Sequence, residues 1–156
     1  MDVVSEMLEL ARVDEDDFVY DVGCGDGRIL ITAAQKYGAS GVGIDIHPGW
    51  VEESRKNARE SGVEDLVKFI RGDVTRANLS KATVVALYQQ LTPNKILRPI
   101  FEKQLKPGTR VVSHNYPIPG WEEKTLVYVN SESGQTHSIF LYQIDGVMHN
   151  IPHYVG

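Results

Sequence analysis

The stretch Asp21-Val22-Gly23-Cys24-Gly25-Asp26-Gly27 lies at the end of an apolar run that begins at Phe18. The run is typical of a buried strand, and the glycines after it allow the backbone to turn tightly and to approach a ligand closely. A helical pattern at 27–37 follows at once, so the free N–H groups and positive partial charge of a helix N-terminus meet the same loop. This order predicts a strand, a ligand-binding loop and a helix.

The same alternation continues through most of the chain. We expect further strands at 41–46, 66–73, 82–88 and 109–115, and helices at 2–12, 48–61 and 93–106. The pattern then changes, because the strand-like runs 125–129 and 139–144 are joined only by a polar turn at 131–135. The order predicts a Rossmann-like, seven-stranded and mostly parallel α/β sheet, with helices on both faces and a C-terminal antiparallel hairpin.

Composition limits the class of protein. The 156 residues, 42% hydrophobic and 24% charged, predict a single globular domain over 1–156. One cysteine, Cys24, gives no basis for a disulfide or a Cys-cluster zinc site, and we expect no metal. We expect a cytoplasmic protein without membrane insertion, because no secretory signal and no apolar run of roughly 18 residues is present. The net charge of −5 argues against a nucleic-acid partner and mildly favours a cationic one, although a simple solubility charge explains it equally well.

The glycine loop itself separates two classes of ligand. A dinucleotide loop needs a glycine at the sixth position, counted from Gly23, but Arg28 stands there, and Asp26 would repel a pyrophosphate. S-adenosylmethionine fits better, because its methionine end is a zwitterion. Its carboxylate suits the helix N-terminus, its ammonium suits Asp21, and its sulfonium needs no phosphate cradle.

Two further acids end the next two strands. Asp45, which lies 20 residues after Gly25, can accept hydrogen bonds from both ribose hydroxyls, although it can also be a loop or helix-capping residue before Pro48. Asp73 can accept from the adenine amino group beside a backbone contact at Val74, or simply make a turn. Ligands of open α/β sheets bind at these strand ends. The predicted cofactor-binding residues are Asp21, Gly23, Gly25, Gly27, Asp45, Asp73 and Val74.

Over roughly residues 2–145 the chain resembles class I, seven-stranded S-adenosylmethionine-dependent methyltransferases. Within that class, the stretches 19–29, 105–114 and 119–121 resemble the small archaeal protein-lysine methyltransferases, relatives of the mitochondrial enzyme that methylates a lysine in the c-ring protein of ATP synthase. The resemblance implies methyl transfer from S-adenosylmethionine to lysine side chains of protein substrates. We expect broad specificity, because 156 residues leave no room for a substrate-recruiting domain. The end of the fourth strand, residues 88–93, lacks the Asn-Pro-Pro-Tyr motif of exocyclic-amine and glutamine methylases.

The methyl acceptor should bind beyond the ends of the fourth and fifth strands. Tyr88 can orient an amine through its hydroxyl or by cation–π contact, His114 can accept a proton or line the pocket, and Trp121 can wall a lysine channel. Each has a plain structural alternative: a strand-end core aromatic, a hydrogen-bonded strand histidine and a packed connection. We predict these three as catalytic, and Gln89, Asn115 and Tyr116 as further pocket candidates.

Two other functions remain open from sequence. A small-molecule N- or O-methyltransferase can use the same fold, but it usually encloses its substrate, and the connections here are short. A non-catalytic S-adenosylmethionine-binding module is the second alternative.

Overall fold

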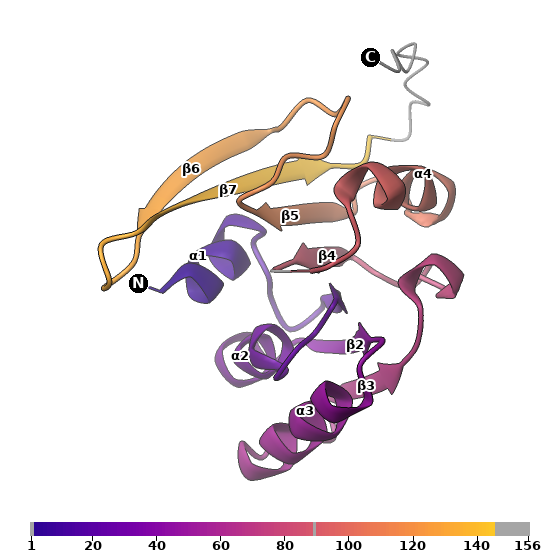
Figure 1. Ribbon diagram of the computed structural model, residues 1–156, viewed down its shortest axis with the longest axis vertical. Coiled ribbons are helices and arrows are strands. Elements are labelled where there is room, and N and C mark those ends of the chain that lie inside the picture. The colour runs from indigo at the N-terminus through magenta and orange to yellow at the C-terminus, as the bar shows by residue number, and fades with distance from the viewer. Residues whose placement is uncertain (1, 89, 146–156) are drawn as a thin grey trace.

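The computed structural model describes residues 2–88 and 90–145. Its strands form a seven-stranded sheet in the order β3-β2-β1-β4-β5-β7-β6 (Figure 1). The parallel strands are β1 (Phe18–Val22), β2 (Ser40–Asp45), β3 (Val67–Arg71), β4 (Val84–Leu87) and β5 (Arg110–His114). Strands β6 (Thr125–Asn130) and β7 (Thr136–Gln143) form an antiparallel hairpin that joins the sheet through β5. The predicted fold class is confirmed.

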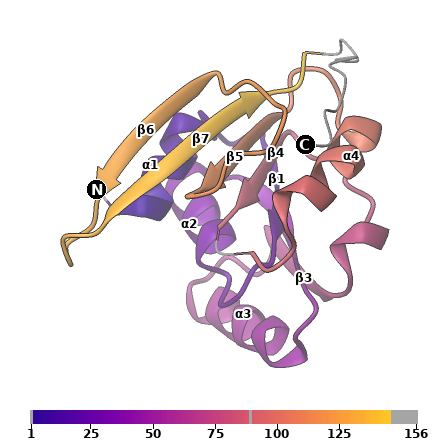
Figure 2. The ribbon, with the colours of Figure 1, turned by 45° about the horizontal axis from the view of Figure 1, so that its top comes forward.

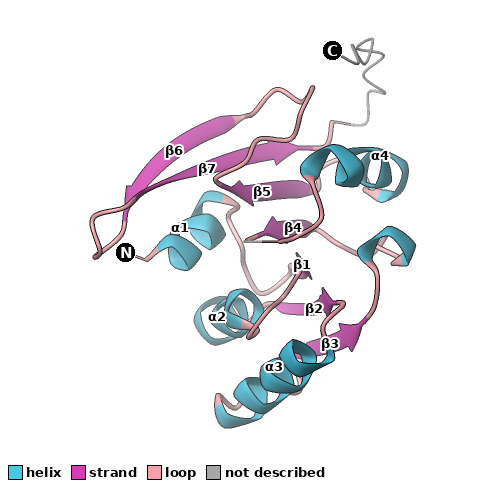
Figure 3. Ribbon diagram, viewed as in Figure 1, coloured by secondary structure: helices cyan, strands magenta, loops and turns pink. Residues whose placement is uncertain are grey.

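Helices cover both faces of the sheet (Figure 3). One face carries α1 (Val3–Leu10), α2 (Arg28–Tyr37) and α3 (Pro48–Glu60), whose apolar side chains join one core cluster. The other face carries α4 (Asn94–Gln104) and a short 3₁₀ helix, η1 (Val74–Arg76), with a second cluster. Burial on both faces explains why the central strands read as continuous apolar runs.

The first loop and helix follow directly from their glycines. Gly27 caps α2 at φ 86°, and Gly38 ends it at φ 70°, both in the left-handed region that L side chains rarely adopt. A side chain at Gly27 would also meet the ring of Phe69, with a Cβ only 3.0 Å from its Cζ. Glycine is therefore required here by backbone conformation and by space.

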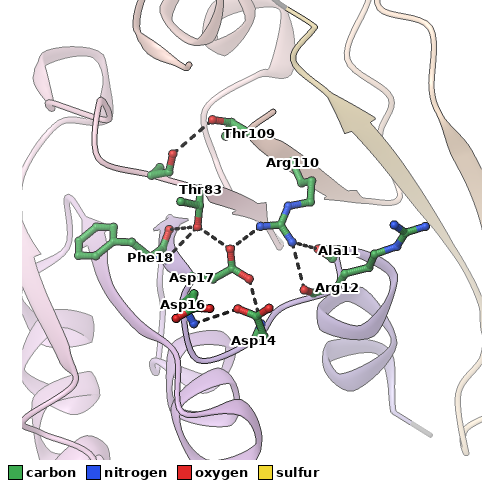
Figure 4. Close-up of polar contacts among 10 residues, drawn as sticks. Ala11, Arg12, Asp14, Asp16, Asp17, Phe18, Thr83, Thr109 and Arg110 are labelled. Carbon is green, nitrogen blue, oxygen red and sulfur yellow. Dashed lines mark hydrogen bonds and ion pairs between the residues drawn. The ribbon is translucent and has the colours of Figure 1, made fainter. Parts of the chain in front are cut away.

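A polar network fastens the amino ends of the central strands (Figure 4). Buried Asp17, just before β1, forms an ion pair with Arg110 of β5 and accepts a hydrogen bond of 2.7 Å from Thr83, just before β4. The same guanidinium donates to the carbonyls of Ala11 (2.7 Å) and Arg12 (3.1 Å) at the end of α1. The network therefore joins α1 to three strands at the sheet edge opposite the glycine loop.

Two elements differ from expectation. Strand β7 begins at Thr136 rather than at 139, and its pairing to β5 ends where His114 meets Ile139, so the hairpin runs past the end of β5 (Figure 2). The sequence does not predict η1, because a three-residue turn leaves no periodic signal. Gln89 lies outside the described residues. No helix in the described part of the chain is long and apolar enough to cross a membrane.

Candidate active site

A cavity of about 370 Å³ opens at the carboxyl ends of β1 to β4. Four loops line it, one after each of these strands: residues 22–26 with 28, 44–47 with 50, 72–74, and 88 with 90–92. The predicted Gly23, Gly25, Asp45, Asp73, Val74 and Tyr88 all lie in this lining, whereas Asp21, Gly27, His114 and Trp121 do not. The structure thus brings together three loops that the sequence assigns to one ligand.

The glycine loop is held against β2. The N–H groups of Gly23 and Cys24 both donate to the carbonyl of Ile44, at 2.8 and 3.0 Å. Gly23 and Gly25 have φ values of 71° and 54°, and a Cβ on Gly23 would lie 3.1 Å from the Cβ of Gln90. The backbone therefore reaches the cavity surface without a side chain in between. Burial raises the pKa of Cys24 to about 12, so its thiol stays protonated.

Asp45 connects two loops of the cavity wall. One carboxylate oxygen accepts from the N–H of Gly25 at 3.0 Å, and the other accepts from the N–H of His47 at 2.9 Å. A carboxylate oxygen has two lone pairs, so each oxygen keeps acceptor capacity toward the cavity. The loop role and the ligand role considered from sequence are therefore compatible.

Asp73 also combines two roles. Its Oδ1 accepts from the backbone N–H of Thr75 at 2.9 Å and from its hydroxyl at 2.8 Å, which caps η1. These hydrogen bonds hold the pKa of Asp73 below its ordinary value. Among the described residues no hydrogen-bond partner occupies Oδ2, so the charged acid faces the cavity with an acceptor to spare.

Asp21 lies behind the cavity wall, fully buried, and neither of its carboxylate oxygens has a hydrogen-bond partner among the described residues. Burial raises its pKa to about 8, and the negative charges of Asp45 and Asp26 add to the rise. An orphaned buried acid is costly, and an ammonium group would satisfy it. With the open glycine loop, this acid fits the zwitterionic end of S-adenosylmethionine.

The fourth loop carries an aromatic wall. The ring of Tyr88 lies 4.8 Å from that of His114, and the guanidinium carbon of Arg28 lies 6.0 Å from the Tyr88 ring centroid. Arg28 itself is held by Asp26 through contacts of 2.7 to 3.3 Å, and this hydrogen bonding raises the pKa of Arg28. The Arg28 guanidinium therefore already makes the cation–π contact with Tyr88 that was considered for a substrate amine.

His114 is buried behind Tyr88, with 3% of its surface exposed. Its Nε2 lies 2.8 Å from Nδ1 of His137 on β7. Burial lowers the pKa of His114 to about 4, and the neighbouring His137 adds to the effect. Asn115 accepts from the N–H of Ser138 at 2.9 Å, so it too ties β5 to β7 rather than facing the cavity.

Trp121 lies against the other face of the sheet. Its ring packs on Phe101 and Tyr142 at centroid distances of 6.2 and 5.6 Å, and its indole N–H reaches Glu102 at 3.4 Å. This position matches the packing alternative, and these contacts give no support to a lysine channel at Trp121. Tyr116 is 69% exposed and does not line the cavity.

Sequence reasoning missed several lining residues. Exposed Ile46 and Trp50 add apolar surface beside Asp45, and exposed Leu91 adds it beside Tyr88. Ile46 directly follows Asp45, the expected ribose ligand. Its position beside Asp45 in the sequence is therefore the signal that could have identified it. Trp50 belongs to α3, and only the fold shows that this helix begins at the cavity.

Parallel strands that end at such a cavity, a glycine loop at a helix N-terminus and acids on three successive strand ends define an S-adenosylmethionine-dependent methyltransferase. A solved structure from Salinibacter ruber, described as an RNA methyltransferase in complex with S-adenosyl-L-homocysteine, is 47% identical; the match covers 95% of this chain and 94% of that one, with a TM-score of 0.88. The chain belongs to the family of ANTKMT methyltransferase domains, whose family model matches residues 21–125.

Curated relatives carry more specific names. A protein-lysine N-methyltransferase of Saccharolobus islandicus is 42% identical over 91% of this chain and 88% of its own length. A human lysine N-methyltransferase, named for the c-ring protein of ATP synthase, is 34% identical over 76% of this chain, which spans about half (50%) of that enzyme. The first relative therefore matches in length as well as in sequence.

Proposed function

We propose that this protein transfers methyl groups from S-adenosylmethionine to the side-chain amine of lysine residues in other proteins, in the cytoplasm. The observation that carries the proposal is the similarity to a protein-lysine N-methyltransferase over most of both chains, at 42% identity. The cavity supports it, because its acceptor side is bounded by Tyr88 and by the exposed Leu91. A protruding side chain can reach such a site without a lid.

The cofactor is proposed to lie along the first three loops. Asp21 would pair with the ammonium group, Asp45 with the ribose hydroxyls, and Asp73 with the adenine amino group beside the backbone of Val74. Gly23 and Gly25 let the backbone approach the methionine end, and Gly27 places the N-terminus of α2 there. The apolar surfaces of Ile46 and Trp50 suit the faces of a purine.

Bound S-adenosylmethionine supplies an electrophilic methyl group on a sulfonium. A lysine must meet it as the neutral amine, and the free amine has a pKa of about 10.4. Partial burial beside Tyr88 and the positive charge of the sulfonium would both disfavour a second cation and so lower the pKa of an incoming lysine. The chain therefore needs no strong base near the amine, and its main task is to hold the amine in line.

One experiment distinguishes lysine from the other classes of methyl acceptor. Tritiated S-adenosylmethionine is incubated with the protein and, in parallel, a protein extract, the same extract with its lysines acetylated, total RNA and a small-molecule fraction. We expect label in the untreated proteins only. Label in RNA would favour the activity named for the Salinibacter relative, and label only in small molecules, or tight cofactor binding without any transfer, would refute the lysine assignment.

A further inference from the structure

Four side chains lie in a row from the cavity toward the edge of the sheet: Arg28, Tyr88, His114 and His137. Arg28 begins α2 and Tyr88 follows β4. His114 ends β5, and His137 is the second residue of β7. The spacings are 6.0 Å from the guanidinium carbon to the Tyr88 ring, 4.8 Å from that ring to His114 and 5.0 Å between the two imidazole rings. In the sheet, β4, which leads to Tyr88, lies between β1, which leads to Arg28 at the start of α2, and β5, which ends at His114.

The outer end of this row is a directional contact. His114 Nε2 and His137 Nδ1 are 2.8 Å apart, so one ring donates its N–H and the other accepts, and both can be neutral. His114 is buried, whereas His137 is half-buried on the part of β7 that extends beyond β5. The hydrogen bond fixes the plane of the His114 imidazole more sharply than packing does, because packing has no preferred direction.

We propose that His137 is a positioning residue for methyl transfer: through His114 it holds the ring of Tyr88 in place at the acceptor end of the cavity. The inference rests on the proposed function only for the identity of the acceptor. Its physical reason is that transfer depends on the alignment of amine and methyl carbon, so a wall displaced by even about one ångström slows the reaction. The extension of β7 past β5 then has a role, because it brings His137 to His114.

The alternative is that the histidine pair only fastens the hairpin. Three variants separate the two. His137→Leu keeps the bulk and removes the hydrogen bond, His137→Asn returns a polar atom close to the place of Nδ1, and Val129→Ala removes apolar packing from the residue paired with His137 on β6. The readouts are kcat and KM for the acceptor, the Kd for S-adenosylhomocysteine, and the melting temperature.

We expect His137→Leu to lower kcat about tenfold while the Kd for S-adenosylhomocysteine stays within about twofold. His137→Asn should recover most of kcat, and Val129→Ala should lower the melting temperature with kcat unchanged. Wild-type kcat in His137→Leu would overturn the proposal. So would an Asn variant as slow as the Leu variant, or an equal loss of kcat in Val129→Ala.

A second measurement does not depend on the acceptor. In wild-type protein, ¹⁵N spectra should show a slowly exchanging imidazole N–H shared between His114 and His137. ¹H–¹³C spectra should show separate signals for the two edges of the Tyr88 ring, because a restrained ring flips slowly. Both should change in His137→Leu, and unchanged Tyr88 signals would contradict the positioning role. If the acceptor proves to be RNA or a small molecule, the same kcat comparison is made with that acceptor, so failure of the lysine assignment is not read as failure of His137.

Discussion

Asp45 is the residue at which loop structure and the proposed cofactor binding meet. Replacing it with Ala removes the proposed ribose contact and the hydrogen bonds to Gly25 and His47. We expect Asp45→Ala to raise the Kd for S-adenosylhomocysteine about tenfold or more, a loss of ~1.4 kcal/mol or more. Calorimetry measures this, with Glu52→Ala, an exposed acid on α3, as the matched control. Unchanged affinity would show that Asp45 is not a ligand.

Asp21 leads to a prediction about protons. Its pKa is raised from 3.8 to about 8, so below pH 8 the carboxyl is mostly neutral in the ligand-free protein. An ammonium partner favours the charged form and lowers that pKa, so binding should release a proton. At about pH 7 we expect S-adenosylhomocysteine binding to release up to about one proton, seen as a dependence of the binding enthalpy on the ionisation enthalpy of the buffer.

Asp21→Asn is the control for this measurement, because it cannot titrate. It should bind more weakly and without proton release. Equal release in the variant would place the titrating group elsewhere, and no release in the wild type would leave Asp21 without its proposed partner. Stability follows from the same pKa: the unfolded chain loses this proton first, so stability declines as the pH rises from 3.8 to about 8, and the Asn variant should lack this decline.

At the scale of elements, the ion pair of Arg110 with Asp17 holds α1 to the amino ends of the strands. Arg110→Met leaves the buried acid unpaired and removes the bonds to the carbonyls of Ala11 and Arg12. We expect a loss of about 2–4 kcal/mol in the free energy of unfolding, measured with urea. Lys106→Met, which removes an exposed cation nearby in sequence, should change little.

Because this network lies opposite the cavity, Arg110→Met should leave the Kd for S-adenosylhomocysteine within about twofold. A large loss of affinity without a loss of stability would mean that the two ends of the sheet are coupled, contrary to the separation between the network in Figure 4 and the cavity lining.

The elements are the part of the structure that local pattern predicts best. The helices and strands follow from 3.6-residue and continuous apolar patterns, and the glycines at 27 and 38 mark both ends of α2. The start of β7 differs from the prediction because residues 136–138 are polar, and their strand form comes from pairing with β6. Cross-strand hydrogen bonds of this kind leave no periodic signal in one segment.

At the scale of the whole molecule, the net charge of −5 bears on recruitment of the acceptor. If lysine-rich proteins are drawn to an acidic surface, screening should weaken the encounter. We expect KM for a lysine-rich protein to rise several-fold between about 50 and about 300 mM salt, while the Kd for S-adenosylhomocysteine changes little. A KM that does not depend on salt would show that net charge plays no part.

What local sequence determined was the half of the candidate site that is proposed to hold the cofactor. The loop 21–27 and the acids Asp45 and Asp73 each follow their own strand, and parallel strands bring such ends to one edge of a sheet. The half that is proposed to receive the methyl acceptor depended on the tertiary structure. His137 meets His114 because strand order and register place β7 beside β5, and Trp121 turns away because its connection packs on α4. The periodicity of apolar residues predicts on which face of a helix or sheet a side chain lies. Which residues it contacts on that face depends on the pairing of segments that are distant in the chain.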